Sequence, residues 1–543
     1  TPDGGGNAIA EFPFFTFLYG DLHAHMISMP LMLLVMGFVL HEVLISGNDK
    51  RGRWSLLTVL ALGGITAGML RATNTWDWIT FMLLGVLGLG FAWWLNTSRI
   101  SRWTLWSLVV RIGVFVGISF LAALPFTTWY ASVYSQAKLW EGARSQIWMY
   151  VTVHGLFLFL LLSLLIWETG RWLRSVYVRS LRGQLPIIIV GLCIVFSLLF
   201  LGVFLSLFGV PFALTSSGLS LAPIPVAIVA MPILVWISVL FLRQGQSREM
   251  RYILALAGLA VGLTLGVEMV VLDGDIGRQN TVFKFYVQAW LLFSVVGGTA
   301  VAWLVQSSTN WSRFARWTWY PLGTALLLAA ALYPIMATRG RSLDRLSPQA
   351  PQTLNDVPLT LDGLAYMQYS WLYEGDPVLI QADPSLAPFS LADDYQIVRW
   401  LQENVQGTPT IMEGMSDREY RWQSRVAITT GLPAVNGWNF HQRQQRTFDP
   451  LPRLVEQRVA NVNAFYTTLS ITEARDILRH YDVRYVIVSS LERAYYPVEG
   501  LVKFDQMVEQ GFLELVYEHG NGKIYQVKPD LQFALEEDVA GGV

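Results

Sequence analysis

The stretch "GDLHAHMISMPLMLLVMGFVLHEVLI" (residues 20–45) decides the class of fold. One acid and two histidines, Asp21, His23 and His25, stand at alternate positions directly before about twenty mostly apolar residues. A helix rises 1.5 Å per residue and the hydrocarbon core of a bilayer is about 30 Å thick, so a run of this length predicts a transmembrane helix. The sequence therefore places three titratable groups at the edge of a membrane span.

The composition extends this interpretation to the whole chain. Of the 543 residues, 53% are hydrophobic and only 14% are charged, whereas soluble domains carry about 25% charged residues. The net charge of −1 gives no reason to expect a nucleic-acid partner. A single cysteine, Cys193, excludes an intrachain disulfide. We predict a polytopic α-helical membrane protein embedded in the cell membrane.

Ten apolar runs have the length of a membrane span. They cover residues 27–46, 54–71, 78–95, 104–124, 147–167, 186–208, 222–242, 251–272, 283–306 and 317–337. The weakest prediction concerns residues 205–225, where Pro211, Pro223 and Pro225 flank "TSSG". This pattern is typical of a break or re-entrant loop, which is tolerated only where protein or water covers the backbone.

Loop charges predict the orientation of these spans. The loops after the first, third, fifth, seventh and ninth spans each contain at least two Lys or Arg residues, and the opposite loops contain few. Cytoplasmic loops carry the excess of Lys and Arg, so we expect the first set in the cytoplasm. The polar motifs and everything after residue 337 are then extracytoplasmic.

The tail has ordinary charge density and alternates helical and strand patterns. Residues 393–405 and 471–481 have helical patterns, 408–414 and 483–490 resemble strands, and 512–528 form a hairpin pattern that turns at "GNG". We therefore predict four parts. They are a first external loop (1–26, the remnant of a longer N-terminus), a transmembrane domain (27–337), a Pro-rich connecting segment (338–392) and an extracytoplasmic α/β domain (393–543).

The spacing of Asp21, His23 and His25 allows two kinds of chemistry. All three side chains share one face of an extended segment, or Asp21 lies above His25 on a helix. Two histidines and a carboxylate are a common set of metal ligands, for Mg²⁺ or Mn²⁺ here, and Asp21 is equally a candidate general base oriented by an imidazole. The structural alternative is that Asp21 caps the first helix among solvated interfacial residues.

A second group of charges lies in "GVEMVVLDGDIGRQNTVFKFYVQAW" (266–290). Glu268 is about one turn inside the eighth span, Asp273 stands at its mouth, and Arg278 and Lys284 follow. One interpretation is internal ion pairing of Glu268 with Arg278 or Lys284. The other is a cationic clamp for an anionic headgroup, since Arg offers phosphate a bidentate fork and Lys a point charge.

Two further motifs hold candidate binding residues. In "RATNTWDW" (71–78) the tryptophans suit an interfacial aromatic belt, which does not explain Asn74 and Asp77. In "SRVAITTGLPAVNGWNFHQRQQR" (424–446) His441 and Arg446 lie among turns marked by Gly and Pro. The structural alternative for the second motif is a solvated polar loop.

The motifs "EFPFFTFLYGDLHAHMISMP", "NTWD", "RQNTVFKFYVQAW" and "GLPAVNGWNFHQRQQR" together resemble the YYY membrane-protein family of Chloroflexi and archaea. That family is similar in layout to the glycosyltransferase C superfamily, which has many spans, an acid in the first external loop and often an extracytoplasmic C-terminal domain. The resemblance implies a lipid-phosphate-linked sugar as substrate. It puts Asp21 in the place of the first-loop acid. It also implies that Arg278 and Lys284 bind the phosphate of the donor.

The sequence departs from this pattern at its start. The superfamily has a span before its first external loop, and here only "TPDGGGNAIA" precedes "EFPFF". We expect N-terminal spans that are missing, cleaved away or supplied by another chain.

The resulting hypothesis is a membrane glycosyltransferase that uses a polyprenyl-phosphate-linked sugar on the extracytoplasmic side. Asp21 and His25 are its candidate catalytic residues. The candidate substrate-binding residues are Asn74, Asp77, Glu268, Asp273, Arg278, Lys284, His441 and Arg446. The alternatives are a non-catalytic scaffold subunit that binds other membrane subunits, and a transporter with Glu268 as an intramembrane ion site.

Overall fold

A computed structural model describes residues 13–19, 23–46, 50–97, 99–130, 137–175, 212–215, 218–221, 224–272, 278–343, 356–358, 360–416, 418–446 and 448–528. The chain divides into two compact units. The membrane unit comprises Thr1–Tyr130 and Tyr134–Ala337, and the C-terminal unit comprises Ala131–Val133 and Thr338–Val543.

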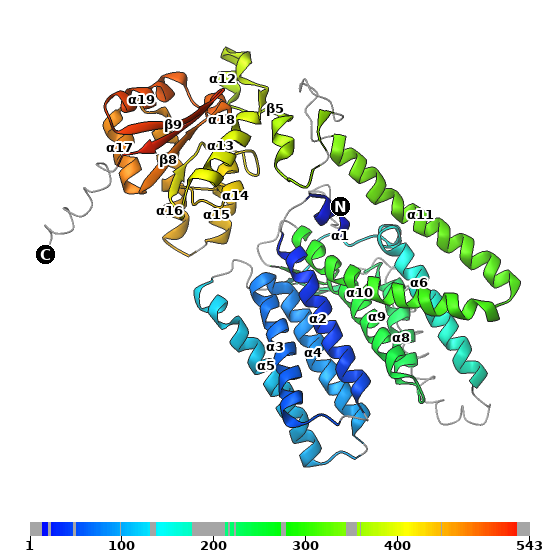
Figure 1. The fold of residues 1–543 in the computed structure, drawn as a ribbon. Helices are drawn as coiled ribbons and strands as arrows, with labels where there is room; N and C mark the ends of the chain where they lie inside the picture. Colours follow the sequence, from blue (N-terminus) through cyan, green and yellow to red (C-terminus); the bar gives the residue numbers. More distant parts are fainter. Residues whose placement is uncertain are drawn as a thin grey trace. The chain divides into compact units, whose positions relative to one another are not determined.

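Long apolar helices dominate the membrane unit (Figure 1). The described helices of this unit, long and short, are α1 (Pro13–Tyr19), α2 (Ala24–Ile45), α3 (Arg53–Thr73), α4 (Thr75–Asn96), α5 (Arg102–Trp129), α6 (Ile147–Ser175), α8 (Ala227–Leu242), α9 (Arg248–Gly266), α10 (Gln279–Ser307) and α11 (Arg313–Leu343). Among the described residues, eight of these helices are long and apolar enough to cross a membrane, namely α2 to α6 and α9 to α11.

The helix bounds correct two of the predicted spans, and a third cannot be compared. The run 222–242 yields only α8, with 16 residues, because Pro223 and Pro225 disfavour helix before Ala227. The run 251–272 ends as helix at Gly266, and its last residues form β4 (Val270–Leu272). The run 186–208 lies outside the described residues.

Two short strand pairs interrupt the helices of the membrane unit. The predicted break in 205–225 is confirmed, since β2 (Phe212–Thr215) and β3 (Gly218–Leu221) form an antiparallel hairpin there. Strand β4 pairs with β1 (Ala137–Leu139) in the antiparallel sense, and Ala137 stands opposite Leu272. This second pair brings the segment before α6 to the segment before α10.

Small residues hold α3 close to α5. A Cβ atom at Gly68 would lie 2.4 Å from the carbonyl oxygen of Ser119, and one at Gly64 would lie 2.7 Å from that of Phe115. Small residues permit such backbone approach between membrane helices. A side chain at either position would force α3 and α5 apart.

The C-terminal unit contains a mixed four-stranded sheet in the order β7-β8-β10-β9. Strands β7 (Thr410–Met412) and β8 (Val483–Val488) are parallel, and β10 (Gly522–Val527) runs antiparallel to β8 and to β9 (Leu513–His519). Helices accompany this sheet. They are α12 (Pro377–Ala382), α13 (Ala392–Asn404), α14 (Arg425–Thr430), α15 (Asn439–Gln445), α16 (Leu451–Thr467), α17 (Ile471–His480), α18 (Ser490–Tyr495) and α19 (Val498–Glu509).

The predicted order of helices and strands in this unit is confirmed. Helices α13 and α17, strands β7 and β8, and the β9–β10 hairpin all lie where their patterns place them. The hairpin turns at Gly520, whose φ of 55° favours glycine. Within the core, Phe465 and Phe504 are fully buried beside Val486 of β8.

The segment 338–392, predicted only as a connection, contains ordered elements. Strands β5 (Trp371–Leu372) and β6 (Phe389–Ser390) pair there, and α12 lies between them. Met367 and Phe389 are buried in one apolar cluster with Leu491 of α18. The elements are too short to produce a period in the sequence, so only their long-range packing reveals them.

Candidate functional site

Asp77 forms a buried hydrogen-bonded network among three helices of the membrane unit. Its carboxylate accepts hydrogen bonds from Ser28 Oγ on α2 (2.5 Å), Asn74 Nδ2 (2.9 Å) and Gln288 Nε2 on α10 (2.8 Å). Thr80 Oγ1 donates to the amide oxygen of Gln288 at 2.6 Å. Asp77 is 1% exposed and lies in the first turn of α4, where the helix dipole favours a negative charge. The network joins α2, α4 and α10.

The two histidines of "GDLHAH" lie close together at the start of α2. His23 immediately precedes the helix and is exposed, whereas His25 is buried. Their ring centroids are 4.3 Å apart, and the Phe283 ring lies 4.8 Å from the His25 ring, edge to face. Thr16 Oγ1 lies 2.5 Å from His25 Nε2. These contacts fix the His25 imidazole between α1, α2 and α10.

The predicted metal set cannot be completed within the described residues. Asp21 lies outside them, and they contain no group of three His, Cys, Asp or Glu residues that could hold a metal ion. His23 and His25 are the members of the set that the structure places side by side.

Lys284 belongs to the same region as Asp77 and His25. It directly follows Phe283 on α10, one turn before Gln288, and it is close enough to Asp77 and His25 to interact with both electrostatically. We call His25, Ser28, Asn74, Asp77, Lys284 and Gln288 the Asp77 cluster. It brings together four residues that the sequence selected in three separate motifs, namely His25, Asn74, Asp77 and Lys284.

Glu268 and Arg278 form a second, separate cluster. Arg278 Nη1 lies 2.9 Å from Glu268 Oε1 and donates to the carbonyl oxygen of Val267 at 3.1 Å, while Nη2 donates to Ser145 Oγ at 3.0 Å. The backbone N–H of Ser145 donates to Glu268 Oε2 at 2.9 Å. The guanidinium also lies 5.7 Å from the Trp140 ring centroid. Of the two interpretations of these charges, internal ion pairing is the one observed.

The ion pair changes what Arg278 can do. Arg278 is 6% exposed and Glu268 is fully buried, so a ligand phosphate would have to displace the carboxylate to reach the guanidinium. Displacing either member of the pair would leave a buried charge without its partner, which is strongly destabilising. Asp273, the third predicted acid of this motif, lies outside the described residues.

The remaining predicted site residues lie in the C-terminal unit. His441 is on α15, exposed, with Nδ1 3.2 Å from the hydroxyl of Tyr420. Arg446 follows α15 and is also exposed. Its neighbour Arg443 pairs with Glu456 at 2.9 Å. This arrangement matches the solvated-loop alternative as well as it matches a binding surface.

A buried charge cluster in the C-terminal unit escaped sequence analysis. Arg425 Nε lies 2.8 Å from Asp394, its Nη2 lies 2.9 Å from Glu492, and its Nη1 lies 3.6 Å from Glu413. All four side chains are almost completely buried. Desolvation raises the pKa of Glu413 to about 7, against the opposing effect of Arg425.

This cluster follows the carboxyl ends of the two parallel strands. Glu413 comes directly after β7, and Glu492 lies in α18, just after β8. Ser489 Oγ donates to Asp394 at 2.7 Å, and Gly414 N–H donates to Glu492 at 2.8 Å. Four charged residues spread from 394 to 492 have no short-range pattern, so no sequence signal could have found them.

The sequence matches the model of one protein family. The family described as "Uncharacterized membrane protein (DUF2298)" matches residues 6–293, more than half of the chain, and this range includes both clusters of the membrane unit. No curated protein matches the chain. Together with the apolar helices, the match confirms the predicted multi-pass membrane protein. The chain therefore belongs to the DUF2298 family of membrane proteins.

Proposed function

We propose that this protein is a glycosyltransferase that takes its sugar from a polyprenyl-phosphate donor on the extracytoplasmic side of the cell membrane. The observation that carries the proposal is the Asp77 cluster. It gathers a buried carboxylate, an imidazole and a cation at one end of α2, α4 and α10, and its imidazole, His25, is the last residue of the "GDLHAH" motif. Ionisable groups at membrane depth are expensive to keep and mark functional sites.

The donor phosphate is assigned to Lys284. Arg278 is held by Glu268, Ser145 and the Val267 carbonyl, so we treat it as a positioning residue for the β1–β4 segment. Lys284, at the start of α10, supplies the positive point charge of the cluster. A cation there would stabilise the negative charge that develops on the leaving phosphate.

The reaction follows from these assignments. Asp21 accepts the proton of an acceptor hydroxyl while the hydroxyl oxygen bonds to the anomeric carbon of the donor sugar. The bond from that carbon to the phosphate oxygen breaks, and the electron pair leaves with the lipid phosphate. His25, held by Thr16 and Phe283, lies four residues from Asp21 and orients this region.

A divalent cation is the second way in which the motif can act. Asp21 would complete the pair of adjacent imidazoles, His23 and His25, and of the two predicted cations Mn²⁺ fits this mixed set better, because Mg²⁺ takes oxygen ligands. The ion would supply a Lewis acid for the donor phosphate. In this form of the proposal Asp21 is a ligand and no longer the base.

The positively charged loops support the orientation. Arg99 lies between α4 and α5, and Arg248 lies at the start of α9, which places both at the ends expected in the cytoplasm. The C-terminal unit is then extracytoplasmic. Protease added to sealed, right-side-out vesicles should remove it, and its survival until the vesicles are lysed would contradict the orientation.

The transfer itself is tested with Asp21→Asn in proteoliposomes that contain a polyprenyl-phosphate sugar. We expect turnover to fall by at least about 100-fold, the lower end of general acid–base contributions. Glu249→Gln is the matched control. It also removes one carboxylate, but in the first turn of α9, at the end expected in the cytoplasm, so it should leave turnover unchanged. With His23→Ala, added Mn²⁺ should restore activity in part only if the motif binds a metal.

The scaffold alternative makes the opposite prediction for the same variant. The N-cap position of α2 is occupied by His23 and not by Asp21, so the predicted capping role of Asp21 is wrong. A purely structural Asp21 is then a solvated interfacial residue, and Asp21→Asn should change the stability by no more than about 0.5 kcal/mol and leave the activity intact. Full transfer by this variant would overturn the catalytic assignment.

A further inference from the structure

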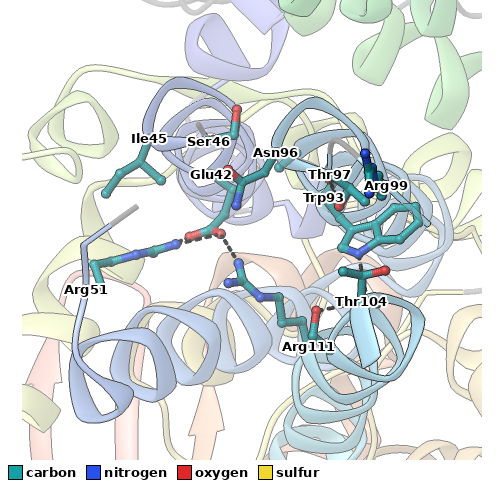
Figure 2. A pocket seen from close by; sticks show the side chains of 12 residues that line it. Glu42, Ile45, Ser46, Arg51, Trp93, Asn96, Thr97, Arg99, Thr104 and Arg111 are labelled. Carbon is teal, nitrogen blue, oxygen red and sulfur yellow. Dashed lines mark hydrogen bonds and ion pairs between the residues drawn. The ribbon is translucent and has the colours of Figure 1, made fainter. Parts of the chain in front are cut away.

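A cavity of about 190 Å³ lies among α2, α4 and α5, at their ends remote from the Asp77 cluster (Figure 2). Glu42 and His25 are both on α2, seventeen residues apart, which corresponds to about 25 Å of helix at 1.5 Å per residue. The cavity is therefore a different site from the one assigned to transfer. A liquid water molecule occupies about 30 Å³, so the space admits a group as large as a phosphodiester.

The cavity has a surplus of positive charge. The charged residues that line it, in the described part of the chain, are Glu42, Arg51, Arg99 and Arg111. Arg51 approaches the buried Glu42 carboxylate at 2.5 and 3.0 Å, and Arg111 lies 3.8 Å from it. The described lining thus holds one carboxylate and three guanidinium groups, and a site of this sign favours an anion. Arg recognises phosphate better than Lys does because its fork matches two oxygens.

The hydroxyl groups of Thr104 and Ser107, which line the cavity, already donate hydrogen bonds to backbone carbonyl groups. Thr104 Oγ1 donates to the Ser101 carbonyl, and Ser107 Oγ donates to the Thr104 carbonyl, both at 2.9 Å. The Trp93 indole closes one wall by donating to that same Thr104 carbonyl at 2.8 Å (Figure 2). Recognition of an anion would therefore depend on the arginines.

Exposed tryptophans mark the depth of this site. Trp54 starts α3, Trp94 ends α4, and Trp103 and Trp106 start α5, with exposures of 83%, 48%, 70% and 62%. Tryptophans concentrate where hydrocarbon meets headgroups. The phosphate groups present at that depth are those of the lipids themselves, and basic pockets between transmembrane helices bind anionic headgroups.

We propose that this cavity binds a phosphate group, and that its source is the headgroup of an anionic phospholipid. The site would anchor α2, α4 and α5 to the membrane leaflet opposite the Asp77 cluster. The proposal does not depend on the transferase assignment, because neither its residues nor its ligand take part in that reaction.

The test is a binding titration of the full-length, delipidated protein in detergent. Short-chain phosphatidylglycerol, short-chain phosphatidylcholine and inorganic phosphate are titrated in separate arms. We expect saturable binding of phosphatidylglycerol, tighter than that of phosphatidylcholine. Arg99→Gln should weaken it about fivefold and Arg99→Gln with Arg111→Gln about 25-fold, since each basic residue near a membrane contributes about a factor of five.

Two matched controls separate the cavity from general surface charge. Arg102→Gln removes a charge at the same helix end, where Arg102 stacks on Trp103 outside the cavity, and it should leave the affinity unchanged. Ser107→Ala should also leave it unchanged. Equal weakening by Arg102→Gln, or equal affinity for both lipids, would overturn the proposal. Saturable inorganic phosphate binding that depends on Arg99, without lipid binding, would overturn the lipid as the source.

Discussion

The carboxylate of Asp77 on α4 accepts a hydrogen bond from the side-chain amide of Gln288 on α10, 2.8 Å away and 211 residues later in the chain. This bond, the one from Ser28 and the one from Thr80 to Gln288 together form a polar link between helices that also pack through apolar side chains. Because Asp77 is buried, the link has structural consequences whether or not Asp77 contacts a substrate.

Asp77→Asn should destabilise the membrane unit. The new amide group would direct N–H toward the donors Ser28, Asn74 or Gln288 and would leave one of them unpaired, at a cost of about 1–3 kcal/mol. Unfolding in detergent measures this loss. Ser28→Ala retains the carboxylate and its other donors, so it should cost less. A stability of Asp77→Asn equal to that of wild type would show that these bonds are not formed.

Arg278→Ala should reveal whether the Glu268–Arg278 ion pair is structural. Removing the guanidinium leaves a buried carboxylate unpaired, which costs about 3–5 kcal/mol. The double variant Glu268→Gln with Arg278→Ala should recover part of this loss, because both members of a contacting pair are then absent. The cycle is measured by unfolding in the absence of donor. Strict additivity of the two stability changes would mean that the pair contributes nothing. Arg278 would then again be a candidate for binding the donor phosphate.

Arg425→Met should unfold the C-terminal unit locally. It leaves Asp394, Glu413 and Glu492 buried without their cation, again at about 3–5 kcal/mol. Hydrogen exchange of β7 and β8 in the full-length protein reports this change. Arg443→Gln is the matched control, since its pair with Glu456 is exposed and such pairs contribute about 0–1 kcal/mol. Equal protection of the strands in both variants would contradict the structural role.

Lys503 predicts a pH dependence of stability in the C-terminal unit. Its side chain is 2% exposed, donates to the Gly500 carbonyl at 2.6 Å and lies 4.3 Å from the Phe504 ring. Burial lowers the pKa of Lys503 from 10.5 to about 7. The unfolded chain therefore binds the proton more tightly, so the stability of the unit should rise with pH between about 7 and 10.5 and stay at its lowest, constant level below about pH 7, where both states carry the proton.

Lys503→Met isolates this effect. At pH 7 the substitution should stabilise the unit by ~1–3 kcal/mol, because the cost of burying an ammonium group exceeds the lost hydrogen bond. The variant should also lose the rise between pH 7 and 10.5. Hydrogen exchange of α19 at several pH values provides the measurement, and parallel pH profiles for wild type and variant would refute the assignment.

The sequence by itself determined the class of the protein and most of its helices. The runs around α2 to α6, α9 and α10 are apolar on nearly all sides, because lipid or protein surrounds each helix and a helix satisfies its own backbone hydrogen bonds. The elements α13, β7, α17, β8 and the β9–β10 hairpin were predictable for a related reason. Their half-buried faces impose local periods of about 3.6 and 2 residues.

Only the tertiary structure decided which polar groups meet. Sequence analysis selected Asn74, Asp77, His25 and Lys284 from separate motifs, but their neighbours Ser28, Thr80 and Gln288 look like ordinary residues of apolar helices. It could not choose between ion pairing and a phosphate clamp for Arg278, and it missed the Arg425 cluster completely. The physical reason is the separation along the chain of the residues that interact. Burial and periodicity act on neighbouring residues and leave a pattern in the chain, whereas a hydrogen bond between residues 211 positions apart leaves none.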